Sequence, residues 1–321
     1  MRRVALIYNP VSGQRRVRRA AIIADVLAVL ENAGIEVKAI ATESPYSAGI
    51  QAQQAIRDGC DTILTCGGDG TAHEALQSMV GGSAALGVIP MGTANALACD
   101  LGLPASPVKA AKMLLTAIPT RVSVGRVFYR SSAGDERSRY FIVAAGIGAD
   151  GLFFLRLDSR LKQRFGYLIY LVEAFRLWAS YKFPMFIASF FLDDDQAPRV
   201  EQVSQILAVR IGNFGGLVQK LVPGAAIGNA NLHAVAFKTR SRLRYVQFML
   251  AVIFRRHSYS KTIELIDCSR VECSDLPGAE GPTFVEADGE LLGTLPVRIE
   301  VVSKALTLLI PARSVDRKSL P

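Results

Sequence analysis

The sequence predicts an α/β domain, with a parallel sheet and helices on both of its faces, followed by an antiparallel β domain with inserted helices. Over the first 120 residues, short β-rich runs alternate with stretches of helical periodicity, a pattern typical of βαβ units. Beyond Pro119–Thr120, strand-like runs separated by turn-rich segments dominate. The chain has 321 residues, 50% of them hydrophobic, which is enough for two domains with a core each.

In the first domain, expected over residues 1–120, four strands alternate with four helices. Short β-rich apolar runs that end in turn residues predict the strands, and an apolar period near 3.6 predicts the helices. The strands are Val4–Asn9, Glu36–Thr42, Asp61–Cys66 and Leu86–Pro90, and the helices are Arg15–Asn32, Ala48–Asp58, Thr71–Val80 and Val108–Ala117.

The second domain is expected over residues 121–305, with residues 306–321 returning to the first. Two helical patterns, Ser159–Ser180 and Ser241–His257, interrupt its strand-like runs, and Ser131–Arg139 and Asp193–Arg199 are typical of hairpin connections. The expected strands are Arg121–Tyr129, Tyr140–Ala145, Met185–Leu192, Val203–Ile211, Leu232–Phe237, Lys261–Ile266, Thr283–Glu286 and Val297–Val302.

The charge balance is basic, with 37 Lys and Arg against 28 Asp and Glu and a net charge of +9. Such a balance favours phosphate-bearing partners: a nucleotide, a nucleic acid or an anionic membrane surface. No acidic residue occurs between Glu201 and Glu264, whereas nine basic residues do. This stretch is either an ordinary solvated basic face or a surface that meets anionic lipid or phosphate.

The five cysteines form no Cys-x-x-Cys pair, which argues against disulfides and zinc and favours a reducing cytoplasm. The apolar run Val4–Tyr8 is too short for a signal peptide, and the uncharged stretch Ala75–Cys99 is broken by Gly and Pro. We therefore expect a cytoplasmic protein.

The strongest motif is Gly67-Gly68-Asp69-Gly70-Thr71, between an expected strand and an expected helix. Its glycines permit positive φ and close approach of backbone N–H groups to an anion, and the helix start adds its positive dipole end. Thr71 and Glu74 match a capping box. Asp69 would repel phosphate unless a divalent metal bridged them, so the motif predicts a metal–phosphate site, with a plain surface turn as the alternative.

Polar turns follow the other expected strands as well. Asn9-Pro10-Val11-Ser12-Gly13 ends the first strand, Thr42 the second, and Gly92-Thr93-Ala94-Asn95 follows the fourth. Because ligands bind at the carboxyl edge of open α/β sheets, we expect these turns to converge there with the Asp69 turn.

Three segments of the second half have two interpretations each. Gly146–Gly151 matches Gly-x-Gly-x-x-Gly but lacks the acid-ended second strand of a dinucleotide site, so tight strand-to-helix geometry explains it better. Glu286-Ala287-Asp288-Gly289-Glu290 is a hairpin turn, or it presents Asp288 or Glu290 as a base for a hydroxyl. The run Phe165–Phe183, with Trp178, is a core helix, or it is an acyl-pocket wall or a membrane-facing helix.

Taken together, these motifs resemble the diacylglycerol kinase catalytic-domain family of bacterial lipid kinases and sphingoid-base kinases. The resemblance implies a nucleotide domain, a β-sandwich-like lipid-substrate domain, an active site between them, and Mg²⁺-ATP phosphorylation of a lipid hydroxyl at an anionic membrane surface, with no nucleic acid. It implies Glu290 as proton acceptor with Asp288 beside it, and Leu306–Pro311 as a strand returning to the first domain. The implied nucleotide-binding residues are Asn9, Ser12, Gly13, Thr42, Gly67, Gly68, Asp69, Gly70, Thr71, Ala72, His73, Thr93 and Asn95, with Asp69 as metal ligand.

Two positions depart from the family pattern. Ala96 follows Asn95 where the family often has Asp, and Asn229 replaces the Asp of an accessory metal site. An amide is a poorer Mg²⁺ ligand than a carboxylate, so the sequence leaves that accessory site open. It also leaves open a nucleotide- or lipid-binding regulator without catalysis, a kinase of a soluble acceptor such as NAD, the identity of the lipid, and the oligomeric state.

Overall fold

The computed structural model describes residues 1–10, 16–131, 134–156, 176, 179–192, 197–216, 220–256, 260–279 and 281–312. Most of the expected helix Ser159–Ser180, including Trp178, lies outside this part of the chain. The chain divides into two compact units. Unit 1 comprises Met1–Val122 and Lys304–Pro321, and unit 2 comprises Ser123–Ser303.

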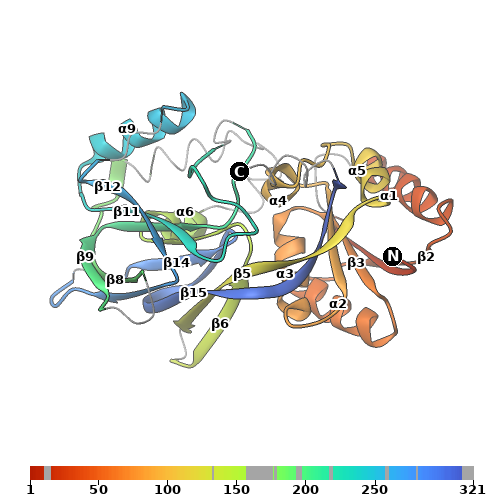
Figure 1. The fold of residues 1–321 in the computed structure, drawn as a ribbon, viewed down its shortest axis with the longest axis horizontal. Coiled ribbons are helices and arrows are strands. Elements are labelled where there is room, and N and C mark those ends of the chain that lie inside the picture. The colour runs from red at the N-terminus through yellow and green to blue at the C-terminus, as the bar shows by residue number, and fades with distance from the viewer. Residues whose placement is uncertain are drawn as a thin grey trace. The chain divides into compact units, whose positions relative to one another are not determined.

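Unit 1 contains the predicted parallel sheet (Figure 1). Its order is β4-β3-β1-β2, and the carboxyl-terminal end of β15 pairs in parallel with β4 through Thr307 and Leu308. Both β3 and β4 are buried along their whole length, as expected for strands with helices on both sides. The strands are β1 (Arg3–Tyr8), β2 (Glu36–Ala41), β3 (Thr62–Gly67), β4 (Ala85–Pro90) and β15 (Glu290–Ile310).

The helices of unit 1 pack in two pairs, α1 with α5 and α2 with α3, one pair on each face of the sheet (Figure 1). They are α1 (Arg16–Glu31), α2 (Ser47–Arg57), α3 (Asp69–Met79), α4 (Ala96–Asp100) and α5 (Pro107–Leu114). The predicted α/β class is confirmed. The short helix α4 was not predicted, because five residues carry too little periodicity to be recognised.

Unit 2 is the predicted antiparallel β domain. One path runs β12-β11-β10-β7-β14-β15, while β13 joins β15 to β8, β8 pairs with β9, and β5 pairs with β6. The strands are β5 (Ile118–Arg130), β6 (Glu136–Phe141), β7 (Ala144–Ile147), β8 (Phe186–Phe191), β9 (Arg199–Val203), β10 (Gln205–Val209), β11 (Leu232–Phe237), β12 (Ile263–Cys268), β13 (Arg270–Asp275) and β14 (Phe284–Ala287). The described helices are α6 (Ala149–Arg156) and α9 (Arg242–Ile253).

Three strand predictions need correction. The expected strand Tyr140–Ala145 of unit 2 is divided between β6 and β7, because the Asp288 carboxylate takes the N–H groups of the intervening residues. The expected strands Val297–Val302 of unit 2 and Leu306–Pro311 of unit 1 belong to the single strand β15, which bends at Lys304, where φ is 47°. The strands β9 and β13 were missed.

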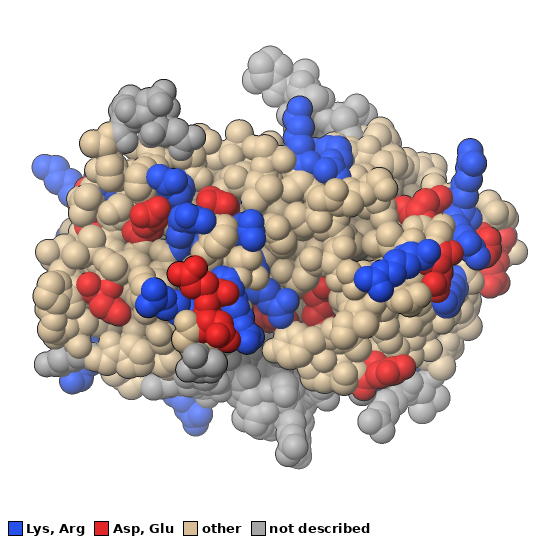
Figure 2. Space-filling model, turned by 90° about the horizontal axis from the view of Figure 1, so that it is seen from below, with Lys and Arg blue, Asp and Glu red and all other residues tan. Residues whose placement is uncertain are grey.

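Charged side chains of both signs are interspersed on the face drawn in Figure 2. In unit 2, Arg199 and Lys238 form a closed ion-pair cluster with Glu201 and Glu264, each contact being 2.8 Å. The hydrogen bond from Arg199 lowers the pKa of Glu264 to about 2. Glu201 and Glu264 are therefore already neutralised by these two cations.

Among the helices of the described residues, none combines the length and the apolarity required to cross a membrane.

Candidate active site

The Gly-Gly-Asp-Gly segment joins β3 to α3, which begins at Asp69, two residues earlier than predicted. Gly68 is the N-cap with φ −93°, and none of Gly67, Gly68 and Gly70 has a positive φ. The freedom of these glycines to adopt a positive φ is therefore not used here. A Cβ on Gly67 would lie 2.5 Å from Thr71 Oγ1, so this glycine is required because strand and helix approach closely.

The predicted capping box of Thr71 and Glu74 does not form, because Thr71 already lies in the first turn of α3. Glu74 Oε2 instead accepts the Ala48 N–H at the start of α2, at 3.1 Å. No side chain of the described residues caps α3. The positive end of its dipole therefore faces the glycine turn, with Asp69 as the acid of the first turn.

The Gly-Thr-Ala-Asn turn after β4 packs directly on the β3–α3 turn. A Cβ on Gly92 would overlap Gly68 Cα, and the Met91 N–H donates to the Gly67 carbonyl at 2.8 Å. Asn95, with φ 52°, accepts the Gly92 N–H at 2.8 Å and donates to the Gly92 carbonyl at 2.9 Å. The Asn95 side chain thus closes its own turn, and the two turns form one backbone surface.

Asp69 is partly exposed at the junction of these turns. Its Oδ1 accepts the Leu97 N–H of α4 at 3.3 Å, which orients the carboxylate at the start of α3. Thr93 is exposed at the tip of the neighbouring turn. A carboxylate oxygen is a suitable Mg²⁺ ligand and the flanking backbone suits phosphate, so these residues fit a magnesium–nucleotide complex.

The remaining residues with a predicted role in nucleotide binding divide into exposed and buried positions. Asn9 and Thr42 follow β1 and β2 directly, and both are partly exposed at the carboxyl edge of the parallel sheet. Ala72 and His73 are buried in α3, with His73 only 1% exposed. The His73 side chain packs inside unit 1, so this burial does not support contact between it and a ligand. Ser12 and Gly13 lie outside the described residues.

In unit 2, Asp288 and Gly289 form the predicted hairpin turn between β14 and β15, with φ of 48° and 85°. The Asp288 carboxylate accepts three backbone N–H groups, from Ile142, Val143 and Ala144, at 2.9–3.1 Å. This side chain anchors the connection between β6 and β7. Its oxygens are therefore engaged as acceptors of three charge-assisted hydrogen bonds.

Glu290 begins β15, and its side chain is 23% exposed. Its Oε2 lies 3.8 Å from Nη2 of Arg139. The two acids that the sequence left open thus differ in their partners: the Asp288 carboxylate binds three backbone N–H groups, and the Glu290 carboxylate lies beside Arg139.

The sequence interpretation missed a pair of acids in unit 2. A Cβ on Gly146 would lie 2.6 Å from Asp150 Cβ and 2.8 Å from Glu286 Oε1, so both side chains pack over this glycine. Burial raises the pKa of Glu286, and the nearby Asp150 raises it further. Burial also raises the pKa of Asp150 to about 6, although it accepts a hydrogen bond from Gln205 at 2.7 Å. The signal available in the sequence was an acid beside each of two glycine-rich turns.

Asp150→Asn is expected to remove part of the pH dependence of stability. The pKa of Asp150 is about 6 in the folded protein against an ordinary 3.8, so the folded state favours the protonated carboxyl. Its contribution to the free energy of unfolding is therefore highest below pH 4 and falls as the pH rises to 6, because the unfolded chain releases this proton first. This loss amounts to about 2–3 kcal/mol. Urea unfolding between pH 4 and 7 should show a smaller decline for Asp150→Asn than for the wild type. Asp25→Asn, which changes an exposed acid on α1, should follow the wild type, and a variant decline as steep as that of the wild type would refute the assignment.

The accessory metal that the resemblance places near Asn229 does not fit this chain. Arg210 is 1% exposed, and its guanidinium donates to the carbonyls of Asn229, Asn231 and Ser123 at 2.5–3.3 Å. Burial lowers its pKa to about 10, so it stays cationic at neutral pH. The described residues hold no cluster of three or more His, Cys, Asp or Glu suited to a metal. The Arg210 guanidinium therefore supplies the positive charge at the loop around Asn229, where the resemblance would place a metal ion.

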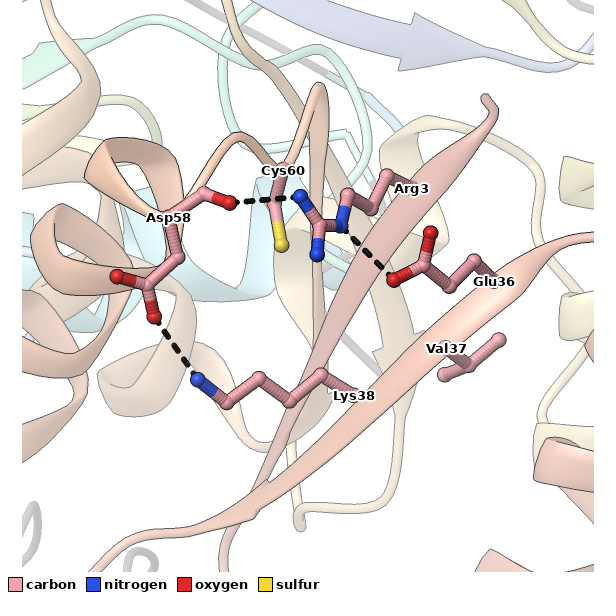
Figure 3. Close-up of a pocket in the computed structure, with 6 residues that line it drawn as sticks. All are labelled: Arg3, Glu36, Val37, Lys38, Asp58 and Cys60. Atoms are coloured by element: carbon pink, nitrogen blue, oxygen red, sulfur yellow. Dashed lines mark hydrogen bonds and ion pairs between the residues drawn. The ribbon is translucent and has the colours of Figure 1, made fainter.

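A pocket of about 270 Å³ lies at the opposite, amino edge of the parallel sheet (Figure 3). Arg3 pairs there with Glu36, and Lys38 pairs with Asp58, both at 2.9 Å. Buried Cys60 also lines it. The four charged side chains of this pocket form two ion pairs with each other. The pocket also lies away from the carboxyl ends of the strands, where α/β sheets bind ligands, so we do not assign the nucleotide to it.

Comparison with family models gives the class of the protein. Residues 3–127 match the diacylglycerol kinase catalytic domain, and residues 142–310 match the YegS C-terminal NAD kinase beta sandwich-like domain. The chain belongs to the diacylglycerol kinase catalytic-domain family, in the branch that carries this C-terminal domain. The predicted resemblance is confirmed.

Relatives and solved structures agree with this assignment. The chain is 26% identical to a diacylglycerol kinase of Staphylococcus saprophyticus, over 92% of this chain and 91% of that one. It is 24% identical to a diacylglycerol kinase of Bacillus subtilis, over 99% of both chains. The fold resembles a putative diacylglycerol kinase from Bacillus anthracis, with a TM-score of 0.75, 19% identity, and coverage of 97% and 96%. A yeast NADH kinase is a more distant fold relative, with a TM-score of 0.50, 10% identity, and coverage of 100% and 89%.

Proposed function

We propose that this protein is a lipid kinase that transfers the γ-phosphate of ATP to the hydroxyl of a lipid of the diacylglycerol or sphingoid-base class. The observation that carries the proposal is the packing of the two glycine turns, Gly68 against Gly92, with Asp69 at the uncapped start of α3. Membership of the kinase family, and relatives named diacylglycerol kinase, support the reaction class and the lipid acceptor.

In unit 1, each proposed role follows from position. The turn backbone and the start of α3 bind phosphate oxygens, because amide dipoles there stabilise negative charge. Asn9, Thr42 and Thr93, on neighbouring strand ends, bind the rest of the nucleotide. Asp69 holds Mg²⁺, which supplies charge neutralisation to the phosphates when bound.

In unit 2, we assign the proton acceptor to Glu290 rather than Asp288. Phosphoryl transfer to an alcohol requires a base positioned on the hydroxyl and little other covalent chemistry. The Asp288 carboxylate is occupied by three backbone N–H groups, whereas Glu290 has one cationic neighbour and remains partly exposed. The proton of the lipid hydroxyl would pass to Glu290 as the hydroxyl oxygen bonds to the γ-phosphorus of ATP, while the bond from that phosphorus to the β–γ bridging oxygen breaks and ADP leaves.

The function is tested by incubating the purified chain with labelled ATP, Mg²⁺ and mixed micelles of diacylglycerol, sphingoid base, ceramide or phosphatidylglycerol. We expect transfer to one lipid class. Tight ATP binding without transfer to any lipid would favour a regulator instead. Transfer to NAD in preference to every lipid would favour a kinase of a soluble acceptor.

Glu290→Gln is expected to lower turnover about a hundredfold, because the amide keeps the size of the side chain but cannot accept the proton. The change should appear in kcat rather than in the KM for ATP. Glu300→Gln is the matched control, since Glu300 lies on the same strand beside Arg298 at 3.5 Å. Turnover of Glu290→Gln within threefold of the control would refute the assignment.

A further inference from the structure

Helix α9 of unit 2 is apolar on two opposite faces. Its inner face carries Tyr245, Phe248 and Val252, all buried. The Phe237 ring on β11 stacks on Tyr245 at a centroid distance of 4.7 Å and meets Phe248 edge-on at 5.1 Å. This inner face packs the helix against the β domain.

The outer face of α9 is apolar although it is exposed. Leu243, Leu250 and Phe254 are 64%, 47% and 69% exposed, and their spacing of seven and four residues places them on one stripe of the helix. Met249 and Ile253 flank this stripe and are 41% and 39% exposed. Five of the eleven large hydrophobic residues that are exposed in the described part of the chain thus gather on twelve consecutive positions. Such a concentration is typical of an interaction surface.

Arginines lie at both ends of this helix. The five are all exposed: Arg240, Arg242 and Arg244 at its start, and Arg255 and Arg256 at its end. The first turn contains no acid, so the arginines at the start oppose the helix dipole. Two of these arginines also make hydrogen bonds: Arg242 donates to the Tyr181 carbonyl at 3.3 Å and Arg244 donates to the Gln247 side chain at 3.2 Å.

The two acids nearest to α9 in sequence pair with other cations. Glu201 and Glu264 bound the acid-free stretch, and both pair with Arg199 and Lys238. The surface formed by the outer residues of α9 and its terminal arginines therefore combines an apolar stripe with net positive charge.

We propose that this α9 surface docks the protein on an anionic lipid bilayer. The helix would lie in the plane of the interface, with Leu243, Leu250 and Phe254 among the acyl chains and the arginines at the level of the anionic headgroups. A second copy of the chain is a poorer occupant, because two such surfaces would bring arginines together without an acid between them. The proposal adds a defined docking surface to the proposed lipid kinase function.

The test is co-sedimentation of the full chain, without nucleotide, with vesicles of phosphatidylcholine alone or with 30% phosphatidylglycerol. The wild type should bind the anionic vesicles and dissociate as salt is raised. Leu243→Ser with Phe254→Ser should weaken partitioning about tenfold or more. Arg255→Glu with Arg256→Glu should do the same on anionic vesicles only.

Matched controls come from helix α2 in unit 1. Ile50→Ser removes another highly exposed apolar side chain, 72% exposed, and Arg57→Glu reverses another exposed charge. Both should bind vesicles like the wild type, and circular dichroism should show all variants folded. Wild-type binding by the α9 variants, or no wild-type binding at low salt, would overturn the proposal. Loss of a dimer in the α9 variants, with vesicle binding unchanged, would assign the surface to a second copy.

Kinase assays separate this proposal from the function itself. With micelle-dissolved short-chain diacylglycerol the α9 variants should turn over like the wild type, whereas with vesicle-embedded lipid they should be slower. A chain that binds anionic vesicles through α9 but phosphorylates no lipid would support the docking surface and contradict the kinase function.

Discussion

Asp69→Asn is expected to lower the turnover of lipid phosphorylation about a hundredfold or more. The asparagine oxygen can still accept the Leu97 N–H that Asp69 Oδ1 accepts at 3.3 Å, so the turn keeps its shape. The negative charge is lost, and a neutral amide is a poorer ligand for Mg²⁺ than a carboxylate. Steady-state kinetics over a range of Mg²⁺ concentrations should show a lower kcat and a higher Mg²⁺ requirement.

The matched control is Asp61→Asn. Asp61 precedes β3, the strand that leads to the Asp69 turn, and its carboxylate accepts the Arg2 N–H at 2.8 Å. Its removal should affect stability only, since it is at the amino edge of the sheet. Equal turnover in the two variants would contradict a role for Asp69 in the reaction. A defect in Asp69→Asn that disappears at saturating Mg²⁺ would still support metal binding, because the ligand would then be replaced by mass action.

Arg210→Leu is expected to cost about 3 kcal/mol or more of the free energy of unfolding. The substitution leaves the buried carbonyl of Ser123 and the part-buried carbonyls of Asn229 and Asn231 without this donor, and an orphaned acceptor that is fully buried costs about 1–3 kcal/mol. Removal of the buried charge offsets part of this loss. Urea unfolding at pH 7 provides the measurement.

Two further variants make this result specific. Arg121→Leu removes an exposed arginine that also donates to a carbonyl, that of Gly82 at 2.8 Å, and should cost less than about 1 kcal/mol. Arg210→Lys retains the charge without the planar fork and should be intermediate. Full rescue of Arg210→Leu by millimolar Mg²⁺ would show that a metal can occupy this loop, contrary to our interpretation.

Local periodicity was sufficient to predict the strands and the longer helices of unit 1, although not the short helix α4. Strands such as β3 and β4 are continuous apolar runs, and α1 and α2 carry a regular apolar period. These elements can therefore be predicted from residues that are close together in the sequence. The same locality identified the Asp288–Gly289 hairpin, whose backbone conformation is intrinsic to the pair. The Gly-Gly-Asp-Gly turn was likewise recognisable, because it joins a buried strand to a helix.

The roles of individual side chains required contacts between residues far apart in sequence. Nothing near Asp288 in sequence indicates that it takes three N–H groups from residues 142–144, the contact on which our proposal of Glu290 as the proton acceptor rests. The space requirement at Gly92 arises from Gly68, and the raised pKa of Glu286 arises from burial beside Asp150. A sequence pattern records which conformations a segment favours. Solvation and hydrogen bonding depend instead on which distant groups the completed fold brings within a few ångströms.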